Sequence, residues 1–180
     1  MVHKGRPAIT QGREKREIRV YDFLDLLLID YETADHSVAA DMEACRQVER
    51  LLKVSICKNL FLCNRQKTAF YLLMLPGEKP FKTKELSSQI GSSRLSFAEG
   101  RDMEKYLDTS PGAASIFGLM NDKYSDVKLL VDEDLLKEAF LGCHPCVNTS
   151  TVKIRSTDIF GKFLSAVNHN YTTVRLVGAD

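Results

Sequence analysis

Hydrophobic residues recur at helical spacing in two stretches of the first third of the chain. Within each stretch they lie three or four positions apart, which is typical of a helix that buries one face. The first set is Val20, Phe23, Leu24, Leu27 and Leu28. The second set is Met42, Cys45, Val48, Leu51 and Leu52. We therefore expect two amphipathic helices that each pack one side inward.

The remaining hydrophobic pattern is mainly that of strands. Residues 31–35 alternate between faces, and the apolar runs 54–62 and 69–75 flank a polar turn, which predicts a hairpin. Further strands are expected at residues 95–98, 127–131, 147–154 and 171–177. Short helical segments are expected at residues 83–90 before Gly91, at 101–107, after Asp132 and after Ser156.

The composition favours one globular domain. The chain has 180 residues, of which 44% are hydrophobic, and this is enough for one good core. No apolar run approaches the roughly 20 residues of a membrane span, and the start has no signal-peptide core. Five cysteines without framework spacing suit a reducing compartment. We expect a cytoplasmic protein that does not contact a membrane.

The charge balance limits how nucleic acid could be bound. With 25 basic and 24 acidic residues the net charge is +1, so no large field recruits RNA and any contact must be local. Residues 1–17 are polar, and we expect a loose basic arm there, with the folded domain spanning residues 18–180. The basic residues of this arm are Lys4, Arg6, Arg13, Lys15 and Arg16.

A histidine in the last third of the chain lies in an irregular connection. Gly142 tolerates backbone angles that other residues resist, and Pro145 fixes its own φ, so we expect His144 on a stiff turn. The β-branched residues that follow predict a strand. Such a turn can aim an imidazole at a neighbouring strand.

Two cysteines flank this histidine, and three interpretations are open. Cys143 and Cys146 form a CxxC, but a redox motif places its thiol at a helix N-terminus, and here a strand follows. Structural zinc needs four ligands, and the other cysteines form no second CxxC. Composition favours the third interpretation, in which both cysteines are small buried side chains and His144 is a hydrogen-bonded turn residue.

Two further features could bind a ligand. Lys58 and Asn59 interrupt an apolar strand, so Lys58 either extends its ammonium into solvent or binds phosphate beside a cleft. Gly112 and Gly118 bound a loop of small residues that could lie close to a ligand or could be an ordinary tight loop. Walker, GxGxxG, GxSxG and HExxH signatures are absent from the sequence.

Several motifs occur together in the order of a known family. They are Lys58-Asn59-Leu60-Phe61-Leu62, Arg94-Leu95-Ser96-Phe97-Ala98, Pro111-Gly112, Phe117-Gly118-Leu119, Asn121-Asp122, Gly142-Cys143-His144-Pro145 and Val147-Asn148-Thr149. Over residues 20–177 the chain resembles the freestanding prolyl-tRNA editing proteins of the YbaK/ProX superfamily, which are related to the insertion domain of bacterial prolyl-tRNA synthetases. The motifs are most similar to its alanine-specific branch. Ile116 departs from the proline that the family usually has there.

The resemblance implies a deacylase that hydrolyses alanine mischarged on proline tRNA, with water attack assisted by the substrate's ribose hydroxyl. It implies that Lys58 engages the phosphate or ribose of the terminal adenosine and that His144 holds the aminoacyl end, both as catalytic residues. No metal or cofactor is implied. The substrate-binding residues expected from the resemblance are Asn59, Phe97, Gly112, Ser115, Gly118 and Gly142.

The expected fold is a single α+β domain with a mixed, mostly antiparallel, curved and barrel-like sheet surrounded by helices. The expected partners are the acceptor end of mischarged tRNA and, as a further candidate, prolyl-tRNA synthetase. Two alternatives stay open. One is a deacylase for cysteine on proline tRNA or for another misacylated tRNA, and the other is a non-catalytic module that binds tRNA or a synthetase.

Overall fold

Two β-sheets and five α-helices form one domain in the computed structural model, which describes residues 2–37 and 42–178. The helices are α1 (Lys15–Leu26), α2 (Met42–Leu52), α3 (Thr83–Gln89), α4 (Gly100–Leu107) and α5 (Leu164–Ala166), which continues a π-helical segment at Asp158–Phe163. The strands are β1 (Val2–Lys4), β2 (Tyr31–Asp35), β3 (Cys57–Asn64), β4 (Phe70–Pro76), β5 (Leu95–Phe97), β6 (Val127–Asp132), β7 (Phe140–Cys143), β8 (Ser150–Arg155) and β9 (Tyr171–Val174).

The first sheet has four antiparallel strands in the order β1-β2-β8-β7. Helix α1 packs on it, as its hydrophobic spacing predicts, with Val20 and Leu24 fully buried in the main core. Leu28 does not belong to this buried face. The helix ends at Leu26, and Leu28 follows in a left-handed conformation (φ 53°) with 85% of its surface exposed.

Residues before α1 are not the loose arm expected from their polarity. β1 pairs with β2 from Val2↔Ala34 to Lys4↔Glu32, so backbone hydrogen bonds fix the start of the chain to the sheet. Arg13 forms ion pairs with Glu17 and Asp35. Strand pairing and charge pairing therefore order a segment whose composition alone suggested no structure.

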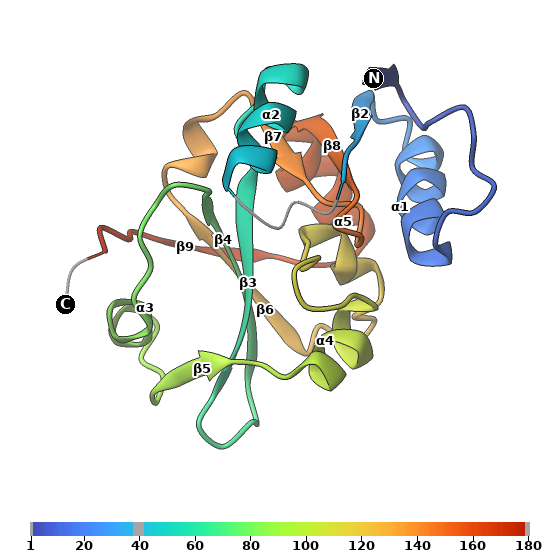
Figure 1. The fold of residues 1–180 in the computed structure, drawn as a ribbon. Coiled ribbons are helices and arrows are strands. Elements are labelled where there is room, and N and C mark those ends of the chain that lie inside the picture. The colour runs from blue at the N-terminus through green and yellow to red at the C-terminus, as the bar shows by residue number, and fades with distance from the viewer. Residues whose placement is uncertain (1, 38–41, 179–180) are drawn as a thin grey trace.

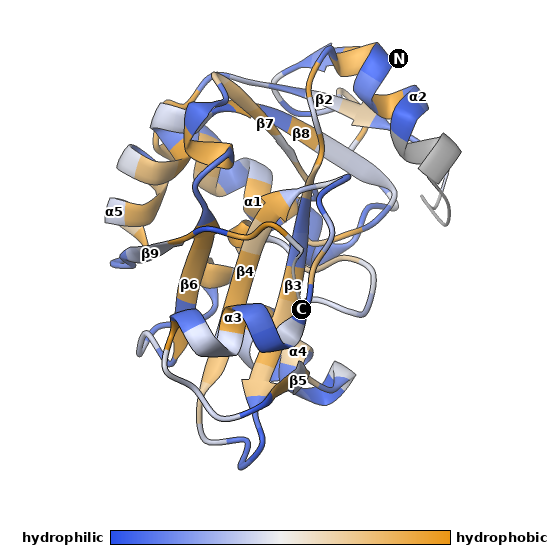
Figure 2. Ribbon diagram, turned by 90° about the vertical axis from the view of Figure 1, so that its left-hand side faces the viewer, coloured by the Kyte–Doolittle hydropathy of each residue, from blue (hydrophilic) through white to orange (hydrophobic). Residues whose placement is uncertain are grey.

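The second sheet has five strands in the order β5-β3-β4-β6-β9. The predicted hairpin is confirmed, since β3 and β4 pair antiparallel from Cys57↔Pro76 to Cys63↔Phe70. β4, β6 and β9 are parallel neighbours, which makes the sheet mixed. β4 is buried on both faces along most of its length, and its continuous apolar run is visible in the hydropathy view (Figure 2).

The edge of this sheet at β3 is covered along only half its length. β5 pairs with Leu62, Cys63 and Asn64 and leaves the first residues of β3 without a neighbour on that side. In Figure 1, β3 runs through the middle of the molecule with β5 crossing near its lower end. The open half of β3 lies where the two sheets approach each other.

The mixed and mostly antiparallel character of the strands agrees with expectation, but the single sheet that we expected does not. The strands divide into two sheets, which a single parallel bridge between Ile56 and Gly142 connects, and those described here close no barrel. The division into two sheets depends on pairing between segments that are far apart in the sequence, so local sequence patterns cannot predict it. Among the described residues, no helix has the length and apolar character needed to cross a membrane.

The short helices largely follow the sequence pattern. Gly91 has the left-handed conformation (φ 62°) expected of a residue that ends α3. Ser156 does not cap its helix, because its hydroxyl donates to the carbonyl of Glu138 at 2.5 Å. In α2, Val48 and Leu52 are buried as predicted, whereas Leu51 is 50% exposed. The inward positions predicted for Met42 and Cys45 lie outside the described side chains.

Gly142 lies in β7, and not in the turn where its conformational freedom seemed to place it. A Cβ atom there would lie 3.1 Å from Ile56 Cγ1, 3.2 Å from Ile56 Cα and 3.2 Å from Val54 Cγ1. The glycine is needed because the segment before β3 crosses close to β7. The left-handed residue in the turn that follows is Cys146 (φ 61°).

We expect Gly142→Ala to lower the free energy of unfolding by about 1–3 kcal/mol, because the added methyl group overpacks the contact with Ile56. Gly161→Ala is the matched control, since nothing lies within 4 Å of a Cβ atom at Gly161. Urea denaturation of both variants measures the difference. Equal stability of the two variants would show that the close contact at Gly142 is not a constraint.

Candidate functional site

A small cavity of about 320 Å³ lies at the open edge of β3. It contains four residues that the sequence motifs singled out, namely Lys58, Asn59, Gly112 and His144. The other lining residues are Glu49, Ile56, Cys57, Gly77, Glu78 and Ala114. Segments far apart in the sequence therefore meet at one place, with β3 on one side and the connection from β7 to β8 on the other.

Lys58 and Asn59 reach this cavity from opposite faces of one strand. Neighbouring side chains on a strand alternate between its faces, so both can line one cavity only where the strand has an open edge. Lys58 is half-buried, and its Nζ donates a hydrogen bond to the carbonyl oxygen of Lys79 at 2.9 Å. The ammonium is thus held beside the cavity by the loop that follows β4.

Two carboxylates hold this loop in place. Lys79 Nζ donates to Asp132 Oδ1 at 2.6 Å and to Asp134 Oδ2 at 2.7 Å. Burial opposes the charge of Lys79, but the hydrogen bonds to the two carboxylates raise its pKa above the ordinary value. Asp132 is fully buried and also accepts from the backbone N–H of Leu176. The two carboxylates therefore fix Lys79, whose carbonyl oxygen accepts the hydrogen bond from Lys58.

Asn59 presents a hydrogen-bond acceptor that is not in use. Its Nδ2 lies 3.4 Å from both the carbonyl oxygen and the Sγ of Cys57, while its buried Oδ1 has no partner among the described residues. A buried polar atom without a partner costs about 1–3 kcal/mol. Asn59 lines the cavity, and an N–H or O–H group of a ligand that reached Oδ1 would remove that cost.

His144 presents a second acceptor to the cavity. Its Nδ1 lies 2.9 Å from the carbonyl oxygen of Ser150, so Nδ1 carries the proton and the neutral ring keeps Nε2 as an acceptor. Burial lowers the pKa of His144, the hydrogen bond to Ser150 acts in the opposite direction, and the charge of His36 lowers it further. The His36 ring lies 5.9 Å away between centroids. His144 is therefore neutral at pH 7.

A buried network from α1 supports the residue that orients His144. The hydroxyl of Tyr21 donates to Glu17 Oε1 at 2.8 Å and lies 3.0 Å from Ser150 Oγ. Glu17, Tyr21 and Ser150 are almost completely buried. Arg13 forms an ion pair with Glu17, with Nη1 and Oε1 2.6 Å apart. The helix thereby holds the first residue of β8, whose carbonyl fixes the His144 tautomer.

Cys143 and Cys146 do not face each other as the redox interpretation of their spacing requires. Cys143 lies with its Sγ 3.2 Å from that of Cys57, and not against Cys146. Burial raises the pKa of the Cys146 thiol to about 12, which is the opposite of an activated thiolate. The described part of the chain contains no group of three or more side chains suited to a metal ion. Cys143 and Cys146 are buried small side chains, as composition favoured.

Four of the expected substrate-binding residues do not line this cavity. Gly142 lies in β7, and Ser115 is buried with its Oγ accepting from the N–H of Phe117 at 3.2 Å. Gly118 packs so closely on α4 that a Cβ atom would lie 2.8 Å from the carbonyl oxygen of Leu107. Phe97 is 62% exposed on β5. Ile116, which departs from the family pattern, is fully buried in the core.

The structure adds two carboxylates that the sequence did not indicate. Glu49 in α2 and Glu78 in the loop after β4 both line the cavity, and Glu49 Oε1 accepts from the N–H of Ile56 at 2.9 Å. Gly77 is required beside them, because a Cβ atom there would lie 2.7 Å from the carbonyl oxygen of Ile56.

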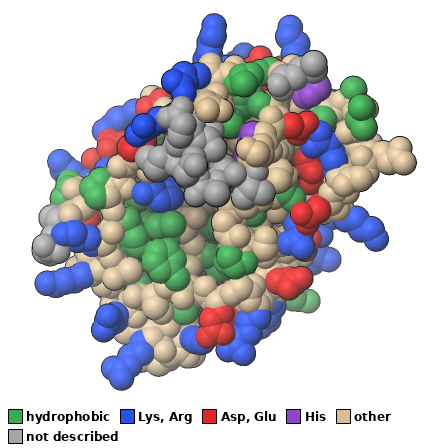
Figure 3. Space-filling model, viewed as in Figure 1, with side chains coloured by type: hydrophobic (Ala, Val, Ile, Leu, Met, Phe, Trp, Pro, Cys, Tyr) green, Lys and Arg blue, Asp and Glu red, His purple; other side chains and the backbone are tan. Residues whose placement is uncertain are grey.

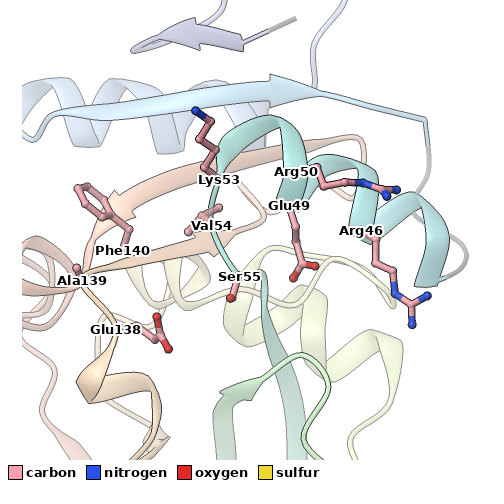
Figure 4. Close-up of a pocket in the computed structure, with 9 residues that line it drawn as sticks. All are labelled: Arg46, Glu49, Arg50, Lys53, Val54, Ser55, Glu138, Ala139 and Phe140. Atoms are coloured by element: carbon pink, nitrogen blue, oxygen red, sulfur yellow. The ribbon is translucent and has the colours of Figure 1, made fainter.

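A larger hollow of about 620 Å³ adjoins this cavity and shares Glu49 with it. Its residues come from α2, the segment after it and the start of β7 (Figure 4). Figure 4 shows Arg46 and Arg50 extending to the side away from Phe140. None of the residues that the sequence singled out as chemical lies in this hollow, so the smaller cavity is the candidate active site.

Known proteins resemble this chain over most of its length. A family model described as an aminoacyl-tRNA editing domain matches residues 36–161. Prolyl-tRNA editing protein ProX of Acetoanaerobium sticklandii is 30% identical over 153 residues, which cover 85% of this chain and 93% of that protein. Prolyl-tRNA synthetase associated domain-containing protein 1 of Danio rerio is 27% identical over 150 residues, or 82% of this chain and 80% of that protein.

Solved structures share the fold. The crystal structure of a candidate trans-editing enzyme for prolyl-tRNA synthetase has a TM-score of 0.68 and 12% identity, and the match covers 92% of this chain and 99% of that chain. The cavity residues Lys58, Asn59, Gly112 and His144 all lie inside the family match, whereas α1 and its network with Ser150 begin before it.

We expect Tyr21→Phe to lower the free energy of unfolding by about 1–3 kcal/mol, because it leaves buried Glu17 and Ser150 without their shared partner. Tyr31→Phe is the control. Its hydroxyl donates to Asp25, whose side chain is 44% exposed and can bond to water instead. Urea denaturation compares the two, and a loss as large in Tyr31→Phe would contradict a special role of the buried network.

Proposed function

Because this chain belongs to the aminoacyl-tRNA editing domain family, and is therefore an aminoacyl-tRNA deacylase, we propose that it removes alanine from mischarged proline tRNA. The observation that carries the proposal is the single cavity that gathers Lys58, Asn59 and His144 at the edge of β3. Mischarged tRNA is then the substrate, and its acceptor end is the part that enters.

The reaction is hydrolysis of an ester. Water adds to the carbonyl carbon of the aminoacyl group, the bond to the ribose oxygen breaks, and that oxygen leaves with a proton. An aminoacyl ester is reactive by itself, so positioning the water and stabilising the developing oxyanion are sufficient tasks. In the proposal the vicinal ribose hydroxyl of the substrate assists the attack. The thiol that lines the cavity, that of Cys57, is engaged elsewhere, since its Sγ donates to the carbonyl oxygen of Gly142 and contacts Cys143 Sγ.

Each cavity residue has a role that its chemistry allows. Lys58 supplies a positive charge for the phosphate or ribose of the terminal adenosine. Asn59 Oδ1 and His144 Nε2 are acceptors, suited to the α-ammonium group of the aminoacyl moiety or to the attacking water. Gly112, with a φ of 85° that favours glycine, lets the backbone approach the bound end closely.

The apolar part of the lining supports a small apolar amino acid such as alanine. The cavity volume of about 320 Å³ lies at the lower end of the ~300–1,000 Å³ usual for small-molecule sites. A synthetase pocket shaped for proline cannot strongly exclude the smaller alanine, and a second site that admits alanine but not proline restores accuracy. Ile56 and Ala114 give this cavity apolar walls against which a methyl group can pack.

Deacylation of proline tRNA charged with alanine, cysteine or proline tests the proposal under single-turnover conditions. We expect alanine to be released about 10- to 200-fold faster than proline, the discrimination that one or a few methylene groups provide. Faster release of cysteine than of alanine would identify cysteine as the amino acid that is removed. Binding of all three tRNAs without hydrolysis would indicate a non-catalytic module and contradict the proposal.

Prolyl-tRNA synthetase is a second proposed partner. The name of the Danio rerio relative associates that protein with the synthetase. For this chain, co-sedimentation with purified prolyl-tRNA synthetase in the presence and absence of proline tRNA is the test. A complex that forms without tRNA would support a direct contact, and its absence in both conditions would contradict one.

We expect Lys58→Ala to weaken tRNA binding or the rate by roughly ten-fold to over a hundred-fold, since a hydrogen bond to a charged group contributes about 1.5–3 kcal/mol. Salt screens such a contact, so the defect should be largest at low ionic strength. Titration of tRNA at two salt concentrations measures it. A defect that does not depend on salt would argue against phosphate binding by Lys58.

His144→Ala should lower the single-turnover rate while tRNA affinity changes little, because the aminoacyl contact is a small part of a tRNA interface. His36→Ala serves as the comparison, since His36 lies beside His144 but does not line the cavity. Rate and affinity are measured on the same preparations. A wild-type rate for His144→Ala would remove this residue from the mechanism.

The rate should depend on pH through His144. Only the neutral ring offers Nε2 as an acceptor, so protonation abolishes its role and activity falls as pH decreases. Because burial and His36 lower the pKa of His144, the fall should lie below about 6.5, the ordinary value for histidine. Glu49, Glu78 and Lys58 also line the cavity, so the residual rate of His144→Ala is the baseline. An unchanged acid limb in that variant would assign the titration to another group.

A further inference from the structure

Two phenylalanine rings lie together on the surface next to the candidate active site. Phe97 in β5 is 62% exposed, although it is a large apolar side chain. Phe81, in the loop before α3, contacts it in an edge-to-face arrangement, with ring centroids 6.4 Å apart and an interplanar angle of 72°. Phe97 projects from the sheet, and Phe81 is half-buried against the core cluster that contains Leu86 and Leu95.

Strand register places this pair on the same face as Lys58. Phe97 is the partner of Leu62 in β3, and cross-strand partners project to the same side of a sheet. Lys58, Leu60 and Leu62 alternate along β3 and so share that face. Phe81 follows Lys79, the residue whose carbonyl holds the Lys58 ammonium. The rings therefore continue the surface that begins at the cavity.

The spacing suits a short length of single-stranded nucleic acid. Four residues of β3 separate Lys58 from the position opposite Phe97, or about 13 Å at roughly 3.3 Å per residue. Successive nucleotides of one strand are spaced about 3.4 Å apart when stacked, so this distance corresponds to about four nucleotides. The 3′ end of a tRNA is a short unpaired strand that ends in the aminoacylated adenosine.

Charge around the rings favours an anionic strand. Lys84 and Arg94 are exposed on the segments that carry Phe81 and Phe97. The nearby carboxylates are already engaged, since Glu85 accepts from the backbone N–H groups of residues 177 and 178, and Glu99 pairs with Lys67 and Arg101. Hydrophobic side chains gather near the middle of the face seen in Figure 3, with Lys and Arg side chains along its lower left margin.

We propose that Phe81 and Phe97 form a stacking surface for the unpaired nucleotides that precede the terminal adenosine of the bound tRNA. Aromatic side chains combined with cations are the usual means of binding single strands without reading their sequence. The identification of the bound nucleic acid as the 3′ end of tRNA rests on the proposed function. In the proposal the nucleotides before the terminal adenosine bind to a surface outside the cavity, whereas the cavity binds the terminal adenosine and its aminoacyl group.

The test is binding of uncharged proline tRNA and of the same tRNA with its unpaired 3′ nucleotides removed, measured by fluorescence anisotropy. The wild type should bind the intact tRNA more tightly than the shortened tRNA. Phe97→Ala should weaken binding of the intact tRNA about 5- to 150-fold, the range of one stacked base, and leave binding of the shortened tRNA as it is. Phe97→Tyr keeps an aromatic ring and should restore the difference. Tyr124→Ala is the matched control, because Tyr124 is 87% exposed and precedes β6, which β3 and β4 separate from β5 in the sheet.

Three outcomes would overturn the proposal. One is an intact-tRNA affinity of Phe97→Ala equal to that of the wild type, and another is an equal loss for both tRNAs. The third is a change from dimer to monomer on substitution, seen by analytical ultracentrifugation, which would assign the rings to contact with a second copy of the chain. Because no step of this test requires hydrolysis, a failure of the deacylase proposal is distinguishable from a failure here.

Discussion

The close crossing of the segment before β3 with β7 is the constraint on which the candidate site depends. The N–H of Gly142 donates to the carbonyl of Ser55 at 3.0 Å. A Cβ atom at Gly77 would collide with the carbonyl oxygen of Ile56 at 2.7 Å, and one at Gly142 would be tightly packed against Ile56 Cα at 3.2 Å. This contact joins the two sheets and places the open edge of β3 beside the connection that carries His144. Without it, Lys58 and His144 would belong to separate surfaces.

The chemistry of the cavity follows from which groups are held and which are left open. Lys58 is fixed by a carbonyl that buried Asp132 holds from behind, and His144 is kept neutral by burial with its tautomer set by Ser150. Asn59 Oδ1 and His144 Nε2 remain as acceptors next to one cation. Such a set is suited to orient a charged, reactive ester and a water molecule, and it agrees with hydrolysis that relies on positioning.

The sequence predicted elements whose pattern is local, and it missed what depends on distant contacts. The β3–β4 hairpin and the buried face of α1 follow from periodicity and were correct. β7 was missed because four residues with a glycine at the third position carry little strand signal. The grouping of Lys58 with His144 came from resemblance to a family. Glu49 and Glu78 carried no signal, since only the tertiary fold brings them to the cavity.

The most direct test of the central claim is to locate the aminoacyl end on the protein. Alanyl-adenosine with an amide in place of the ester resists hydrolysis and can be titrated into the ¹⁵N-labelled chain while amide chemical shifts are followed by NMR. The account predicts the largest shifts at Cys57, Lys58, Asn59, Gly112 and His144, which line the small cavity. Shifts concentrated instead in the larger hollow around Arg50, Lys53 and Phe140 would contradict it.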